Sequence, residues 1–240
     1  MDSTSSSSTK RTELRMARSM CWHCQSEVHG EYFCEQCVKV QPLSKELDYF
    51  TCLGLPRLLN IDPAALEAKF YELSRAFHPD FFQNKAEAEQ AISLRNSALL
   101  NTAHRTLKDP IRRAEYLVQL EAGAAKDIRT SPPADLFEEI LALQENLEEY
   151  RSASPEQGQA GLGQLRARLK ADCETLEQRQ REMEERLFKL FTAWDALQDR
   201  PEQAEDVKAG KEAVLKEMRD ILSNRTYLRN IVSDLVDTLG

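Results

Sequence analysis

The chain has 240 residues, 41% hydrophobic and 30% charged, so most of it can fold around a core. The formal net charge of −8 argues against a nucleic-acid-binding protein, which needs a basic face. The sequence lacks both an apolar run of the roughly 20 residues needed to cross a membrane and a signal-peptide core. The eight glycines are few, and long stretches rich in Ala, Leu, Glu, Gln and Arg predict an all-α protein without a sheet.

Residues 1–18 are rich in Ser and Thr and predict a disordered tail. A transit peptide is the alternative, but Asp2 and Glu13 weaken it because such peptides are poor in acidic residues. We therefore expect a cytoplasmic protein, with mitochondria as the alternative location.

Four of the six cysteines lie in two C-x-x-C knuckles, Cys21-Trp22-His23-Cys24 and Cys34-Glu35-Gln36-Cys37. Clustered cysteines of this kind indicate metal binding in a reducing compartment rather than a disulfide framework. Two knuckles supply the four thiolates of a tetrahedral zinc site. A redox dithiol is the alternative, because a single C-x-x-C can also carry thiol chemistry.

The sequence thus predicts a zinc-binding module at residues 19–42. The predicted ligands are Cys21, Cys24, Cys34 and Cys37. We expect His23 and His29 to be non-ligands. A closed site of four thiolates stabilises a fold and does not catalyse, and a module this small needs the metal to fold. The knuckles could also support self-association.

A helical region is predicted at residues 46–120. Asp62 and Pro63 form a helix start, and apolar residues then recur with helical spacing at Leu66, Phe70, Leu73 and Phe77. Pro79 stops this helix, and a loop follows from about residue 80 to 85. A second helix is expected at about 86–107, and two helices joined by so short a loop pack antiparallel. Its predicted inward residues are Ile92, Leu99, Leu100, Ala103 and Leu107.

A third helix starts at Asp109-Pro110, with Ile111, Tyr116, Leu117 and Leu120 as its apolar side. Residues 121–134 then predict a linker, because they hold Gly and Pro without apolar periodicity. Residues 135–240 predict a three-helix bundle. Its helices are expected at about 134–150, 165–197 and 201–239, with a loop or a loose helix start at Gly158, Gly161 and Gly163.

The tripeptide His78-Pro79-Asp80 follows the first long helix and precedes the second. It forms no catalytic site, since no nucleophile accompanies it. A histidine and an aspartate held around a proline suit the presentation of a hydrogen-bond donor and a carboxylate to a partner protein. The alternative is a helix-stop loop with a chance histidine and aspartate.

This arrangement resembles the J-domain, and Asn101 to Pro110 resembles the boundary of the second helix in that family. The resemblance implies that the loop and the preceding helix contact a DnaK-type chaperone and stimulate its ATPase. The implied contact residues are His78, Pro79, Asp80, Lys69 and Arg75. Glu67 and Glu72 reduce the positive charge of the helix before the loop. Its two cations could be supplemented by Arg95, Arg105 and Lys108.

The helical second half narrows the resemblance to the HscB type of J-protein, a co-chaperone of iron–sulfur cluster assembly. The segments Arg113 to Leu117 and Leu136 to Leu147 carry this likeness. It implies that the bundle binds an iron–sulfur cluster scaffold protein. The implied contact residues are Phe137, Leu141, Glu145 and Tyr227, and the sequence departs from the family pattern at Glu138 and Ala142. By periodicity alone, Phe137 and Leu141 would be bundle core and Glu145 solvated.

Two other functional classes compete with this adaptor hypothesis. A J-protein with another client, or a zinc-ribbon regulatory protein, would share parts of the pattern. The knuckles, however, lack the basic aromatic face of a nucleic-acid binder. An enzyme is disfavoured, because the sequence shows neither a nucleophile–base pair nor a phosphate-binding loop.

Overall fold

The computed structural model describes residues 19–28, 32–44, 47–122, 132–152, 159–198, 200 and 205–240. The chain divides into two compact units, Met1–Pro110 and Ile111–Gly240. The predicted tail and most of the predicted linker lie outside the described residues, as do His29, Gly158 and Pro201, for which the sequence also made predictions. The predicted domain limits stay predictions.

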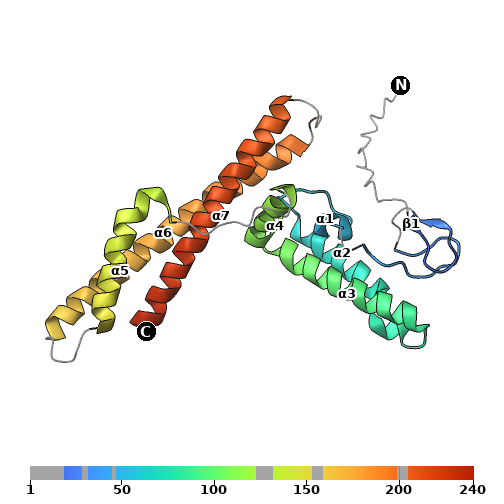
Figure 1. The fold of residues 1–240 in the computed structure, drawn as a ribbon, viewed down its shortest axis with the longest axis horizontal. Helices are drawn as coiled ribbons and strands as arrows, with labels where there is room; N and C mark the ends of the chain where they lie inside the picture. The colour runs from blue at the N-terminus through green and yellow to red at the C-terminus, as the bar shows by residue number, and fades with distance from the viewer. Residues whose placement is uncertain are drawn as a thin grey trace, which may run out of the picture. The chain divides into compact units, whose positions relative to one another are not determined.

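Two helices form the frame of the first unit, α2 (Pro63–Ala76) and α3 (Glu87–Lys108). As predicted, α2 starts at Pro63, and the Asp62 side chain accepts a hydrogen bond of 3.0 Å from the backbone N–H of Ala64. The helix ends at Phe77. A 3-10 turn, η1 (Pro79–Phe82), occupies the predicted loop, so the chain reverses and α3 packs along α2 (Figure 1).

The buried side of α3 is a stripe of two kinds of residue. Leu100, Ala103 and Leu107 are fully buried as predicted, whereas Ile92 and Leu99 are only half-buried. The stripe continues toward the start of the helix through three buried polar residues, Glu89, Ser93 and Asn96. The short helix α1 (Tyr49–Cys52), which is capped by Asp48, packs against α3.

The cysteine-rich segment holds a small sheet, which the sequence analysis did not predict. Strands β1 (Ser19–Met20) and β2 (Glu27–Val28) pair antiparallel, and Phe33 forms a single bridge with Val40. Each knuckle turns the chain back on itself, so its flanking residues face each other and exchange backbone hydrogen bonds. The rest of the described secondary structure is helical, as expected.

The second unit contains α4 (Pro110–Ala122), η2 (Ala134–Leu136), α5 (Phe137–Ser152), α6 (Gln159–Gln198) and α7 (Glu205–Leu239). Helix α6 packs against both α5 and α7, as the predicted bundle requires. The shared core consists of Ile140, Leu143, Leu147, Leu169, Cys173, Leu176, Leu228, Leu235 and Leu239. None of the described helices is long and apolar enough to cross a membrane.

Two details of the second unit differ from the sequence-based expectation. Helix α6 begins at Gln159, earlier than the expected start at about residue 165, and it includes Gly161 and Gly163, in agreement with the alternative of a helix start at these glycines. Helix α4 buries Arg113, Ala114, Leu117 and Val118, whereas Ile111, Tyr116 and Leu120 are half-buried. The buried face therefore lies to one side of the predicted one.

Asn96 is fully buried on α3, and its side-chain amide satisfies two backbone groups. It accepts a hydrogen bond from the N–H of Leu43 at 3.0 Å and donates one to the carbonyl of Gln41 at 2.9 Å. We predict that Asn96→Ala lowers the free energy of unfolding of the first unit by about 2–4 kcal/mol, since both groups lose their partner.

Denaturant-dependent hydrogen exchange of the α3 amides measures this loss. The control is Asn101→Ala, which removes an exposed amide from the same helix and should change the stability by less than about 0.5 kcal/mol. Equal effects of the two substitutions would contradict the prediction.

Candidate functional sites

The four cysteines of the knuckles converge on one point. Their sulfur atoms all lie within 4.8 Å of one another, and Cys21 and Cys37, like Cys24 and Cys34, are 3.6 Å apart. Zinc bound tetrahedrally by thiolates at about 2.3 Å needs sulfur atoms about 3.8 Å apart. The close pairs join one knuckle to the other, which suits a single four-ligand site better than two separate dithiols. These residues could hold a metal ion.

The two knuckles have the same backbone design. The N–H of Gln25 donates to the carbonyl of Cys21, and the N–H of Val38 donates to that of Cys34. Gln25 and Val38 each follow the second cysteine of a knuckle and have φ of 60° and 58°, in the left-handed region. A β-branched valine rarely adopts that conformation, so the fold holds it there at some cost.

Local hydrogen bonds favour thiolates in part of the cluster. The Ser26 hydroxyl, 3.1 Å from the sulfur of Cys34, lowers the pKa of that thiol to about 6. Burial alone would raise the pKa of Cys21, but the backbone N–H groups of Cys24 and His23 bring it below its usual value. Burial raises the pKa of Cys37 to about 12. A metal ion would therefore have to displace protons from this cluster as it binds.

The predicted chaperone-contacting loop lies at the surface. The side chains of His78 and Asp80 are 52% and 69% exposed, and the backbone N–H of Asp80 donates to the Nδ1 atom of His78 at 3.4 Å. Phe81 is 67% exposed and lies edge-on to the His78 ring. Pro79 starts the 3-10 turn that fixes the backbone between these side chains. The loop thus presents an imidazole, a carboxylate and an aromatic ring to solvent.

Exposed cations lie on the two helices that the loop connects. Lys69 and Arg75 on α2 are both exposed, and Lys69 pairs with Glu72 at 2.8 Å. Of the supplementary cations, Lys108 pairs with Glu67 at 2.8 Å, and its hydrogen bond lowers the pKa of that carboxyl. Arg95 and Arg105 are exposed on α3. Exposed pairs of this kind contribute little to stability, so these residues can exchange partners readily.

The predicted scaffold-contacting residues lie mainly on the exposed side of α5. Phe137 and Leu141 are 56% and 49% exposed, and Glu145 is exposed one turn further on. Periodicity alone placed Phe137 and Leu141 in the bundle core, and that alternative is wrong, because the core side of α5 consists of other residues. Tyr227 on α7 is only half-exposed and packs against the bundle core.

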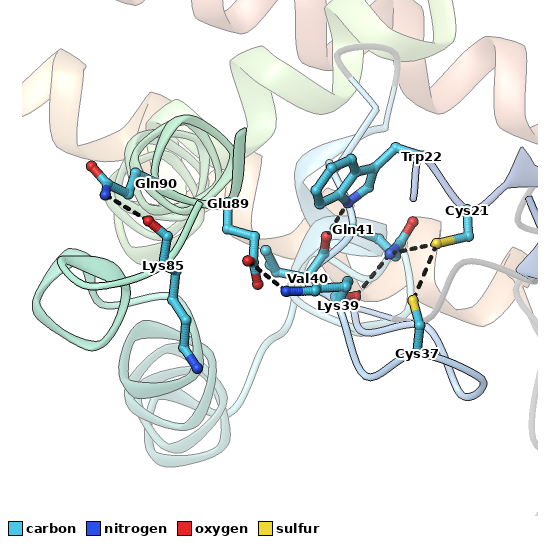
Figure 2. A network of polar contacts seen from close by, with 9 residues as sticks. All are labelled: Cys21, Trp22, Cys37, Lys39, Val40, Gln41, Lys85, Glu89 and Gln90. Atoms are coloured by element: carbon cyan, nitrogen blue, oxygen red, sulfur yellow. Dashed lines mark hydrogen bonds and ion pairs between the residues drawn. The ribbon is translucent and has the colours of Figure 1, made fainter. Parts of the chain in front are cut away.

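The contacts that join the cysteine module to α3 were not predicted from the sequence (Figure 2). Lys39 forms an ion pair of 2.7 Å with buried Glu89, and this hydrogen bond lowers the pKa of the carboxyl. Asn96 binds the backbone at Gln41 and Leu43. A signal was present, since three polar residues continue the apolar stripe of α3 with the same spacing. Such positions need polar partners when they are buried.

Curated relatives match about three fifths of the chain. The chain is 31% identical over 149 residues to the iron–sulfur cluster co-chaperone protein HscB homolog of Arabidopsis thaliana, which covers 62% of the chain. It is 31% identical over 157 residues to the iron–sulfur cluster co-chaperone protein HscB of Mus musculus, which covers 63% of the chain. The chain is therefore similar in sequence to HscB co-chaperones. The matches span 56% and 64% of the relatives' lengths, and no family model matches the chain.

Solved structures of HscB proteins match the fold of this chain. The crystal structure of human co-chaperone protein HscB matches with a TM-score of 0.63 at 23% identity, covering 91% of this chain and 97% of that one. Chaperone HscB from Vibrio cholerae matches with a TM-score of 0.50 at 25% identity, covering 81% and 100%. The HscB-like helical fold with an N-terminal four-cysteine group is thereby confirmed.

The geometry of the cysteine cluster predicts one divalent metal ion for each chain. Cys34→Ser removes one of four thiolates and should weaken binding by at least about 100-fold, more than the loss of a supporting group costs. Titration with Co²⁺, followed through its thiolate charge-transfer absorption, measures the affinity.

Cys173→Ala is the matched control, because this cysteine lies in the bundle core outside the cluster. It should leave the Co²⁺ affinity unchanged. A wild-type protein that binds no ion, or equal losses in both variants, would rule out the site.

Proposed function

We propose that this protein is a co-chaperone of iron–sulfur cluster assembly that acts as an adaptor and not as an enzyme. Its J-domain loop stimulates the ATPase of a DnaK-type chaperone, and its α5 face delivers a cluster scaffold protein to that chaperone. The observation that carries this proposal is the exposed His78-Pro79-Asp80 turn between α2 and α3, in a chain whose curated relatives are named iron–sulfur cluster co-chaperones.

The composition of the loop supports a role in binding a partner. Its imidazole and carboxylate are exposed to solvent, where they can pair with groups of a partner protein. The cations Lys69 and Arg75 of α2 would meet an acidic surface and speed the encounter. We therefore propose His78, Pro79, Asp80, Lys69 and Arg75 as the chaperone-binding residues.

The exposed side of α5 supports a role in binding a second partner. Phe137 and Leu141 place apolar surface one turn apart, and Glu145 continues the same face with a charge. An aromatic and an aliphatic anchor with a charged rim have the composition of a protein interface. We propose these three residues, with the half-exposed Tyr227, as the scaffold-binding surface.

Carrying both surfaces on one chain gives the adaptor its effect. A scaffold held on α5 reaches the chaperone at a local concentration set by the link between the units, without any new contact. We further propose that the metal is zinc in a structural role, because four thiolates close the coordination sphere. A cytoplasmic location and self-association through the knuckles stay predictions.

His78→Gln is predicted to abolish stimulation of a DnaK-type ATPase, since glutamine lacks the ring that the loop presents. Lys69→Ala and Arg75→Ala should each raise the half-maximal co-chaperone concentration about threefold to tenfold, because they weaken electrostatic complementarity. Steady-state ATP hydrolysis with the wild type and each variant measures both effects.

Asn101→Ala serves as the control, because it changes an exposed residue of α3 outside the proposed contacts. It should stimulate as the wild type does. If the wild-type protein leaves the hydrolysis rate unchanged, the proposed function is wrong.

The combined variant Phe137→Ala, Leu141→Ala and Tyr227→Phe is predicted to weaken binding of an iron–sulfur cluster scaffold by at least about 30-fold, since it removes the central anchors. Phenylalanine at 227 keeps the packing of the half-buried ring. Calorimetric titration of scaffold into full-length protein measures the affinity.

Val236→Ala is the control, because Val236 is a 53% exposed apolar residue of α7 outside the proposed surface. Its scaffold affinity should equal that of the wild type. Unchanged binding in the combined variant would show that the scaffold, or another client, uses a different surface.

A further inference from the structure

We propose that the four-cysteine module positions the His78-Pro79-Asp80 loop, with Phe33 and Lys39 as the positioning residues, so that loss of the metal loosens the loop. This inference rests on the proposed chaperone contact for its functional consequence only. Its structural part stands on the contacts of the module with Phe77, directly before the loop, and with Glu89 in the first turn of α3, after the loop.

The first contact is at Phe77, the residue directly before the loop. Phe77 is fully buried, and the ring of Phe33 stacks on it with centroids 5.9 Å apart and an interplanar angle of 14°. Tyr32 meets the same ring edge-on at 5.5 Å. The carbonyl of Phe77 accepts hydrogen bonds from Ser93 and Ser97 of α3 at 2.7 and 2.8 Å. The start of the loop is therefore held between α3 and two aromatic rings of the module.

The second contact of the module is on α3, just beyond the other end of the loop. Gln90 donates from its side chain to the carbonyls of Gln83 and Lys85, which ties the end of the loop to the first turns of α3. The neighbouring residue on that helix is Glu89, which receives Lys39 of the module at 2.7 Å (Figure 2). This pair is 32% exposed at Lys39 and 6% exposed at Glu89, so water screens it less than a surface pair.

The module transmits the state of the cysteines to these contacts. The N–H of Cys34 donates to the carbonyl of Lys39 at 2.9 Å, and the side chain of Gln41 donates to that carbonyl and to the sulfur of Cys21. Trp22 donates to the carbonyl of Val40 at 2.7 Å (Figure 2). The segment that carries Lys39 is thus bonded to both knuckles, and Phe33 directly precedes Cys34.

Because so small a module lacks an apolar core of its own, its backbone order depends on the metal. The described buried cluster around the knuckles consists of Cys21, Val28 and Cys34, and two of these three are predicted ligands. Without an ion to draw the thiols together, the knuckles lose their closure, and Phe33 and Lys39 lose their fixed positions. Helices α2 and α3 then stay folded, but the loop between them samples more conformations. Ordering the loop on binding then lowers its affinity for the chaperone.

Hydrogen exchange of residues 77–85 in the full-length, metal-loaded protein tests this inference without any partner. Phe33→Ala and Lys39→Glu should each accelerate exchange there by about tenfold, the size expected for loss of an aromatic pair or a partly buried ion pair. Removal of the metal with a chelator should accelerate it at least as much. Met20→Ala, which truncates a 58% exposed side chain of the same module, is the control and should have no effect.

A charge reversal separates positioning from damage to the metal site. The double variant Lys39→Glu and Glu89→Lys restores an opposite-charge pair and should recover the slow exchange that Lys39→Glu loses. Metal content is measured for each variant. If Phe33→Ala loses its metal, the variants of Lys39 and Glu89 decide whether the module positions the loop, because neither of these residues is a cysteine. Unchanged exchange of residues 77–85 in Lys39→Glu, or after metal removal, would overturn the inference.

The ATPase assay then shows the functional consequence. Lys39→Glu should raise the concentration for half-maximal stimulation while leaving the maximal rate unchanged, and the double variant should restore the wild-type concentration. A wild-type protein that does not stimulate the chaperone would refute the proposed function, and the exchange measurements would still decide whether the module positions the loop.

Discussion

The buried amide of Asn96 is the interaction on which the arrangement of the first unit depends. It binds the backbone at Gln41 and Leu43, where the chain leaves the cysteine module. Both backbone groups are shielded from water, so the segment can lie against α3 only if this side chain satisfies them. With the segment in place, Lys39 reaches Glu89 and Phe33 reaches Phe77. The cysteine module therefore packs as part of the first unit and is not an independent domain.

Helix α3 uses one periodic face for three kinds of contact. Its later turns bury Leu100, Ala103 and Leu107, and its earlier turns use polar residues to bind the module and the carbonyl of Phe77. The exposed turn at His78 lies between α2 and α3, and buried contacts at Phe77 hold its start. A rigid base of this kind keeps a binding loop in one conformation, which reduces the entropy lost on binding a partner.

In the second unit, the residues that form the core and those that face solvent lie on different sides of α5. Helix α5 turns Ile140, Leu143 and Leu147 toward α6 and α7 and leaves Phe137 and Leu141 exposed. Exposed large apolar residues one turn apart are costly in water unless a partner covers them. The two proposed binding surfaces therefore differ in character, since the loop is polar and charged and the α5 face is apolar.

The sequence by itself determined the helical fold, the start of α2 at Pro63, the convergence of four cysteines and the place of the His78-Pro79-Asp80 turn. These features follow from local rules of capping, periodicity and knuckle spacing, which act within a few residues. Only the tertiary structure decided that Phe137 and Leu141 are exposed, because periodicity shows an apolar face and not what covers it. It also decided the union of the module with α3, since the contacts of Asn96 and Glu89 join residues about fifty positions apart. No local pattern specifies which buried polar groups will meet across such a distance.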